Sequence, residues 1–161
     1  MKREFQEDAG RMRGMVDVSA KNETFRFARA KAIVKLKESI IDLIKSRKIL
    51  KGDVFEQAKV AGIMAAKKTS DIIPLCHPLR ITEVSISFSF IEDGVLITSE
   101  VSALDRTGVE MEALVACSIA ALTIYDMCKM YDRGIEIRDI MLLEKRGGKS
   151  GTYVRGEKID G

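Results

Sequence analysis

The sequence is poor in histidine, proline and cysteine, and it contains no tryptophan. Its three cysteines, Cys76, Cys117 and Cys128, are odd in number and unevenly spaced. This pattern argues against a disulfide framework and favours a reducing compartment, so a cytoplasmic protein is expected. No cysteines have zinc-site spacing and the chain offers one histidine, so a metal ion held by the protein is not expected.

A large excess of either charge is also missing. The chain has 27 basic and 24 acidic residues, which leaves a net charge of +3. Proteins devoted to nucleic acids usually carry a strong basic excess, so no nucleic-acid partner is expected. No membrane association is expected either, because no uncharged apolar run is long enough to span a bilayer and the charged N-terminus is unlike a signal peptide. The composition fits one soluble globular domain over residues 1–161, with flexible ends at 1–14 and 153–161.

Hydrophobic periods predict the order of the elements. Alternation predicts strands over 27–37, 82–90, 95–103 and 135–144, with a hairpin turn at 92–94. Helical signals predict a helix over 39–48 capped by Ser39, a helix capped by Asp53, and a long helix over 108–131 opened by a Thr107–Glu110 capping box. The order β-α-α-β-β-α-β indicates an α+β domain, the ferredoxin-like split β-α-β with an extra helix. In it a four-stranded antiparallel sheet packs against helices.

The helix expected over 108–131 is apolar almost all round and rich in alanine. A helix of this kind in a small domain must be covered on more than one side. Homo-oligomerisation would cover it, so we expect the chain to associate with itself.

The lone histidine and both prolines occur together in the segment Pro74–Pro78. Two fixed φ angles make this loop stiff, and it carries a side chain that readily exchanges protons near neutral pH. The pattern is compatible with a rigidly mounted site residue. It is equally compatible with a structural turn in which the histidine is hydrogen-bonded.

Ionisable residues interrupt the long apolar helix. Glu112 and Asp126 are 14 residues apart, which places them on the same side of a helix, and Lys129 follows Asp126 at a spacing that allows an ion pair. A carboxylate and an ammonium group in partial burial can form a proton-transfer couple. The alternative is an ordinary ion pair at a helix end.

A second cluster, Lys145–Gly151, combines glycines with cations. Glycines let the backbone approach an anion closely, and the cations neutralise it. The spacing does not match a Walker A loop, and a solvated, flexible basic turn is the default interpretation of such a charge run.

Six ordered segments carry a family resemblance. They are MVDVSAK at 15–21, KGDV at 51–54, DIIPLCHPL at 71–79, TGVEMEAL at 107–114, AALTIYDMCK at 120–129 and GGKSG at 147–151. Together they resemble the molybdenum cofactor biosynthesis protein C family, the cyclic pyranopterin monophosphate synthases. The resemblance implies a lyase that converts 3′,8-cyclo-7,8-dihydroguanosine 5′-triphosphate to cyclic pyranopterin monophosphate and diphosphate. It also implies a homohexamer, a trimer of dimers, with active sites at subunit interfaces.

The resemblance also implies roles for single residues. It makes Asp126 the catalytic acid/base and Lys129 the catalytic lysine. It implies substrate contacts from Leu75, Cys76, His77, Glu110, Met111 and Glu112. It places Arg26, Lys51, Lys145 and Lys149 around the triphosphate, with Asp17 and Lys21 as further candidates. No protein-held cofactor is expected, although a divalent ion could arrive with the triphosphate.

The sequence departs from some family members at Ser70 and at Asp105–Arg106, and neither site is expected to touch the residues named above. From composition and fold alone, the rival function is a non-enzymatic module that binds a nucleotide or RNA. An RNA-binding sheet would expose aromatic residues, whereas the outward positions of the strand over 82–90 hold serine and glutamate. A regulatory module for a small ligand would leave the Asp126–Lys129 couple and the basic clusters unexplained.

Overall fold

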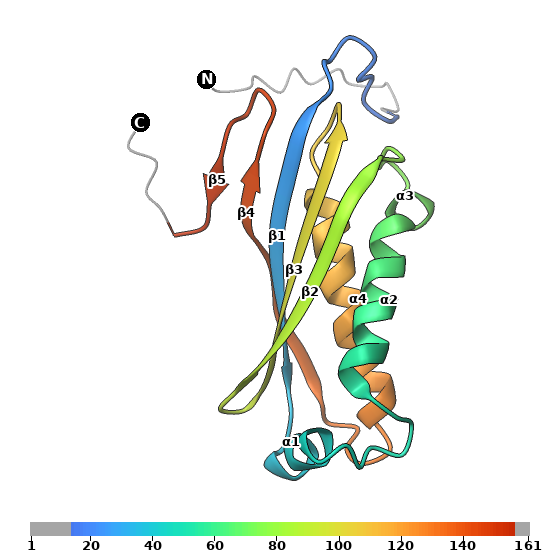
Figure 1. Cartoon of the computed structure of the whole chain (residues 1–161), viewed down its shortest axis with the longest axis vertical. Helices are drawn as coiled ribbons and strands as arrows, with labels where there is room; N and C mark the ends of the chain where they lie inside the picture. The colour runs from blue at the N-terminus through green and yellow to red at the C-terminus, as the bar shows by residue number, and fades with distance from the viewer. Residues whose placement is uncertain (1–13, 157–161) are drawn as a thin grey trace, which may run out of the picture.

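A computed structural model describes residues 14–156 of the chain, and Figure 1 shows the arrangement of the elements. The strands are β1 (Thr24–Lys35), β2 (Ile81–Ile91), β3 (Gly94–Asp105), β4 (Glu136–Arg146) and β5 (Tyr153–Val154). The helices are α1 (Glu38–Lys45), α2 (Val54–Lys67), α3 (Thr69–Ile72) and α4 (Glu110–Cys128). The flexibility expected of residues 1–13 and 157–161 lies outside the described residues.

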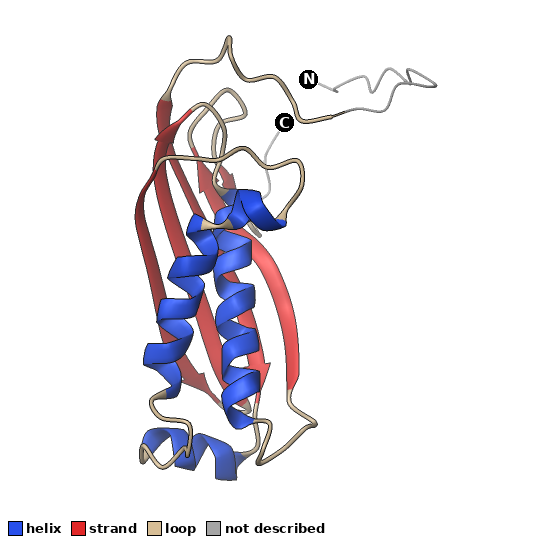
Figure 2. Cartoon of the chain, turned by 90° about the vertical axis from the view of Figure 1, so that its right-hand side faces the viewer, coloured by secondary structure: helices blue, strands red, loops and turns tan. Residues whose placement is uncertain are grey.

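The strands form one antiparallel sheet in the order β2-β3-β1-β4-β5. Its first four strands have the order expected of a split β-α-β fold, so the predicted α+β class is confirmed. Helices α2 and α4 lie side by side on one face of the sheet (Figure 2), while α1 and α3 lie at opposite ends of the layer. The fifth strand differs from the expected four: Tyr153 and Val154 were expected in a flexible tail, yet they pair with β4.

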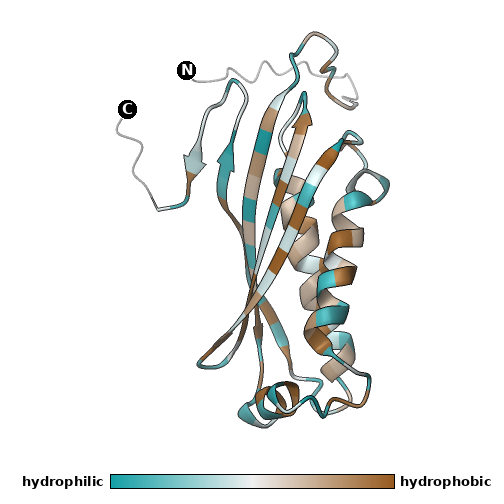
Figure 3. Ribbon diagram, in the orientation of Figure 1, coloured by the Kyte–Doolittle hydropathy of each residue, from teal (hydrophilic) through white to brown (hydrophobic). Residues whose placement is uncertain are grey.

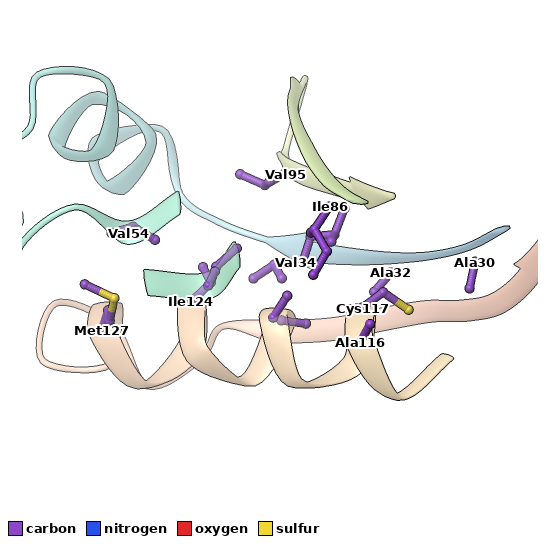
Figure 4. Packing of buried hydrophobic residues seen from close by; sticks show 14 of the residues in the cluster. Ala30, Ala32, Val34, Val54, Ile86, Val95, Ala116, Cys117, Ile124 and Met127 are labelled. Atoms are coloured by element: carbon purple, nitrogen blue, oxygen red, sulfur yellow. The ribbon is translucent and has the colours of Figure 1, made fainter. Parts of the chain in front are cut away.

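Alternation along the strands predicted the core correctly, and Figure 3 shows it as bands of contrasting hydropathy. On β1, Ala28, Ala30, Ala32 and Val34 are fully buried and face the helices. Small side chains at these positions let α4 approach the sheet closely, and the larger Ile124 and Ile86 fill the space between the layers (Figure 4).

Helix α4 is long and apolar enough to cross a membrane by composition, but more than half of it is buried inside this domain. It packs against β1, β3 and α2, which explains its almost continuous apolar surface. Ser99 of β3 fastens it further, because its buried hydroxyl donates a 2.6 Å hydrogen bond to the carbonyl of Ala113. The helix is therefore a core helix.

Of the three helix caps predicted from the sequence, the structure contains one. The Asp53 side chain accepts a 3.1 Å hydrogen bond from the Glu56 N–H and caps α2 as predicted. The cap predicted at Ser39 is wrong, because α1 begins at Glu38 and has no side-chain cap. The Thr107 capping box is also wrong: α4 begins at Glu110 itself, so this carboxylate lies in the first turn and is free to face a cavity.

Candidate active site

A two-part cleft lies at the N-terminal end of α4. Its inner compartment, about 330 Å³, lies among the Pro/His loop, the first turn of α4 and the N-terminal segment 14–23. A larger cationic compartment, about 660 Å³, extends from there toward β1 and the glycine loop 147–151. Lys21, Thr107, Gly108 and Glu110 line both, so the two compartments adjoin.

Glu112 is the buried carboxyl group of the inner compartment, with a side chain that is 3% exposed. Burial, with a smaller contribution from the nearby Glu110 carboxylate, raises its pKa from 4.5 to about 7. A substantial fraction of Glu112 is therefore protonated at neutral pH and can donate a hydrogen bond. Burial also raises the pKa of the Cys76 thiol in the same compartment, which does not suit a nucleophilic cysteine.

The Pro/His loop fastens the N-terminal segment 14–23. His77 Nε2 lies 2.7 Å from the Val16 carbonyl oxygen. A carbonyl oxygen can only accept, so Nε2 carries the hydrogen and Nδ1 is left for another partner. Asp17 is the next residue after Val16, and its side chain accepts a hydrogen bond from the Ser19 N–H. This hydrogen bond is the main cause of the lowered pKa of Asp17, and the nearby His77 makes a smaller contribution. These contacts hold the segment whose Val16, Val18 and Lys21 line the inner compartment.

Positive charge dominates the cationic compartment. Its cationic side chains come from four segments: Lys21, Arg26, Arg106, Lys145 and Lys149. Among the described residues that line it, Glu110 is the one carboxylate, and its Oε1 lies 3.6 Å from Lys145 Nζ. The surplus of cations suits an anion with several charges.

Arg26 is fixed within this compartment. Its side chain is 7% exposed, and its guanidinium donates to the carbonyl oxygens of Asp105 (3.3 Å) and Arg106 (3.2 Å). The glycine loop lies directly against it. Gly147 and Gly148 have φ angles of +99° and +79°, and a Cβ on Gly148 would overlap the Arg26 guanidinium. The glycines therefore let the loop approach β1 and Arg26.

Asp126 and two lysines form a separate cluster at the other end of α4. Asp126 Oδ1 lies 2.7 Å from Lys129 Nζ, and its Oδ2 lies 3.0 Å from Lys51 Nζ. Hydrogen bonds and charge from Lys129 and then Lys51 lower the Asp126 pKa, so the group is a carboxylate at neutral pH. Tyr131 supports the turn that carries Lys51, because its hydroxyl accepts a 2.9 Å hydrogen bond from the Leu50 N–H.

The structure divides the expected site residues into these two groups. At the cleft are the loop residues, the first turn of α4 and most of the cations: Lys21, Arg26, Leu75, Cys76, His77, Glu110, Met111, Glu112, Lys145 and Lys149. Asp17 lies beside the cleft, between the lining residues Val16 and Val18, and lines neither compartment. Asp126, Lys129 and Lys51 form the other group, so Lys51 does not lie with the other cations. Sixteen residues of helix separate Glu110 from Asp126, a rise of about 24 Å.

Comparison with known proteins identifies the family of this chain. The sequence model of the MoaC family matches residues 15–148. A cyclic pyranopterin monophosphate synthase of Novosphingobium aromaticivorans is 52% identical over 150 residues, 93% of this chain and 96% of that protein. A synthase of the same name from Listeria innocua is 56% identical over 142 residues, covering 86% and 88% of the two chains. This chain belongs to the MoaC family.

Several residues of this MoaC-family cleft were not predicted from the sequence. Val16, Val18 and Thr107 line the inner compartment, and all three stand in or beside the segments that carry the resemblance. Arg106 corrects an expectation: it lines the cationic compartment and its carbonyl accepts a hydrogen bond from Arg26. The reason is that β3 ends beside the start of β1, which brings Asp105 and Arg106 next to Arg26.

Proposed function

We propose that this chain is the cyclic pyranopterin monophosphate synthase of molybdenum cofactor biosynthesis. The observation that carries this function is more than 50% identity to synthases of that name over almost the whole chain. The reaction expected is conversion of 3′,8-cyclo-7,8-dihydroguanosine 5′-triphosphate to cyclic pyranopterin monophosphate with release of diphosphate. The enzyme is a phosphorus–oxygen lyase acting on a nucleotide-derived substrate.

The two compartments of the cleft match the two parts of this substrate. The triphosphate takes the cationic compartment, where Lys21, Arg26, Lys145 and Lys149 supply charge. The guanine-derived ring takes the inner compartment, beside Leu75, Cys76, His77, Met111 and Glu112. The Glu110 side chain suits the N–H donors of such a ring. Glu112, which is partly protonated, can accept from an N–H through its carbonyl oxygen and donate its own hydrogen to a ring acceptor.

Asp126 and Lys129 supply the proton transfers. Closure of a cyclic phosphate requires a base that removes a proton from the attacking hydroxyl, while the departing diphosphate gains charge. Asp126 is in its carboxylate form at neutral pH, because its pKa lies below its ordinary value, and this is the form that can accept a proton. Lys129 and Lys51, each within 3.0 Å of it, can donate protons or neutralise charge.

The active site requires two chains. The cleft and the Asp126 cluster lie at opposite ends of α4, too far apart for one substrate to contact both ends in one chain. A neighbouring copy that brings its Asp126 cluster to the cleft would complete the site. Val60, Met64 and Leu122 are each more than half exposed on α2 and α4, and a second copy would cover such apolar surface. The assembly proposed is the hexamer, a trimer of dimers.

The reaction needs no cofactor held by the protein. Its steps are the rearrangement of the purine-derived ring system to a pyranopterin, the proton transfers that this requires, and the displacement of diphosphate by phosphate cyclisation. Side chains can serve these steps by acid–base catalysis. Within residues 14–156, no group of three or more His, Cys, Asp and Glu side chains is placed to hold a metal ion. A divalent ion bound to the substrate triphosphate fits this proposal, and the three cysteines are free thiols, which suits a cytoplasmic enzyme.

Turnover of the cyclised dihydro-GTP by the intact oligomer tests the proposal, with diphosphate and cyclic pyranopterin monophosphate as products. Asp126→Asn, Asp126→Ala and Lys129→Ala should fold normally, because the pair is exposed, and should lose about a hundredfold to ten-thousandfold in kcat. Glu56 and Lys59 form an exposed pair with the same spacing on α2, so Lys59→Ala is the matched control with full activity. Full activity in an Asp126 or Lys129 variant would contradict the catalytic roles proposed for this pair. Absence of turnover by the wild type would contradict the proposed enzyme function.

A further inference from the structure

We propose that Arg106 binds the terminal phosphates of the substrate and ties the N-terminal segment 14–23 to the cationic compartment. This inference rests on the proposed function. Arg106 lines the compartment, and its Nη1 lies 3.4 Å from the Ser19 carbonyl oxygen. Ala20, Lys21 and Asn22, which follow Ser19, line the same wall.

The backbone of Arg106 is held on both sides. Its N–H donates a 2.8 Å hydrogen bond to Asp105 Oδ1, and its carbonyl accepts from Arg26 Nη2 at 3.2 Å. The other oxygen of Asp105 accepts from the Arg80 N–H at 2.9 Å. The base of the side chain is therefore fixed, and substrate binding need not order it.

The guanidinium of Arg106 has unused binding capacity. Within residues 14–156 it forms no ion pair within 4.0 Å, and its one hydrogen bond is the long contact with Ser19. The carboxylates of Glu23 and Asp105 lie close enough for the charge of Arg106 to contribute to their lowered pKa values. A guanidinium has five N–H donors and can hold phosphate oxygens with two of them at once. Arg26, the other arginine of the compartment, already donates to two carbonyl oxygens. Arg106 is thus the arginine with more donors to offer a phosphate.

The same side chain has a mechanical role. His77 holds the segment at Val16, Arg106 holds it at Ser19, and Arg80 pairs with Glu23. Arg106 is the tether of these three that also faces the cationic compartment. A phosphate bound to its guanidinium would fix this tether and hold Lys21 against the same anion. Phosphate binding and ordering of segment 14–23 are therefore coupled through Arg106.

Binding of inorganic triphosphate to the full oligomer, measured by calorimetry, tests the inference separately from turnover. Arg106→Ala should weaken binding about tenfold to a hundredfold, the effect of losing a charged hydrogen bond, and Arg106→Lys should restore part of the loss. With substrate, Arg106→Ala should raise KM by a similar factor with little change in kcat. Triphosphate should slow amide exchange over 14–23 in the wild type and fail to do so in Arg106→Ala.

Arg80→Ala is the matched control, because Arg80 tethers the same segment at Glu23 but does not line the cationic compartment. A clearly smaller loss of triphosphate affinity in Arg80→Ala supports direct phosphate binding by Arg106. Wild-type affinity in Arg106→Ala, or an equal loss in Arg80→Ala, overturns it. If the wild type turns over substrate but either of these outcomes is found, the Arg106 inference fails while the proposed function stands. An inactive wild type that still shows the Arg106 effect would instead remove the function and keep the phosphate site.

Discussion

Glu112 and Asp126 are carboxyl groups on the same helix that the structure places in opposite environments. Glu112 is buried, and its pKa is raised to about 7. Asp126 is exposed between two lysines, which lower its pKa. Two titratable groups with pKa values shifted apart can serve as a neutral hydrogen-bond donor and an ionised base at the same pH. Under the proposed function, Glu112 could therefore donate a hydrogen bond to the ring, while Asp126 is in the ionised form that accepts a proton.

The raised pKa of Glu112 predicts a pH-dependent effect of Glu112→Gln on stability. Because the folded pKa lies above the unfolded value of 4.5, the contribution of Glu112 is fully present below pH 4.5 and is lost as pH rises through about 7. Glutamine has no such loss. Denaturant unfolding should therefore give similar stabilities for both proteins near pH 4.5. At pH 8 the variant should be more stable by up to about 3 kcal/mol. An equal difference at both pH values would contradict a raised pKa.

At the scale of elements, the glycine loop 147–151 shows how a backbone conformation supports the site. Gly148 and Gly151 both have positive φ angles, +79° and +69°. An added Cβ would overlap the Arg26 guanidinium at Gly148 but would meet no atom within 4 Å at Gly151. A side chain would therefore strain the backbone at both positions, but only at Gly148 would it also clash with Arg26.

Gly148→Ala should consequently impair phosphate binding more than Gly151→Ala. Both variants should lose about 1–2 kcal/mol of stability from the left-handed conformation. Only Gly148→Ala must also displace Arg26 or the loop, so its KM should rise about tenfold or more, the effect of weakening a charged hydrogen bond. Thermal unfolding measures the loss of stability in each variant, and steady-state kinetics measures the change in KM. Equal KM values in the two variants would show that the loop does not position Arg26.

Helices and strands with a sustained hydrophobic periodicity could be predicted from the sequence. Features that depend on a single contact between distant residues could not. The alternation along β1 identified the buried Ala28 and Val34 because the whole strand is half-buried. Strand β5 has two residues and therefore no period, and it exists because it pairs with β4. The Thr107 capping box failed because Glu110 occupies the first turn of α4 and faces Lys145, which no local pattern could indicate.

The candidate site was predictable as a set of residues but not as an arrangement. The family resemblance named every charged side chain of both clusters except Arg106. It could not show that Lys51 lies beside Asp126, because this depends on α2 beginning where α4 ends. It also left out Arg106, whose position beside Arg26 results from the pairing of β1 with β3.

At the scale of the whole molecule, the separation of the cleft from the Asp126 cluster predicts complementation between inactive chains. Asp126→Ala damages one end of α4, and the double variant Lys145→Ala/Lys149→Ala damages the cleft at the other end. If each active site combines the cleft of one chain with the Asp126 cluster of its neighbour, mixed oligomers contain some intact sites. Random mixing of equal amounts makes about a quarter of the sites intact in a symmetric assembly.

The two variants should each be almost inactive alone and should regain about a quarter of wild-type turnover after co-expression and purification through separate tags. The control is a mixture of Asp126→Ala with Lys129→Ala. Both changes lie in the same cluster, so every combined site would remain defective. Restored activity in the first mixture and none in the control follows only if the sites are shared between chains. No restoration in the first mixture would mean that one chain builds each site alone, which would require α4 or the cleft to rearrange when substrate binds.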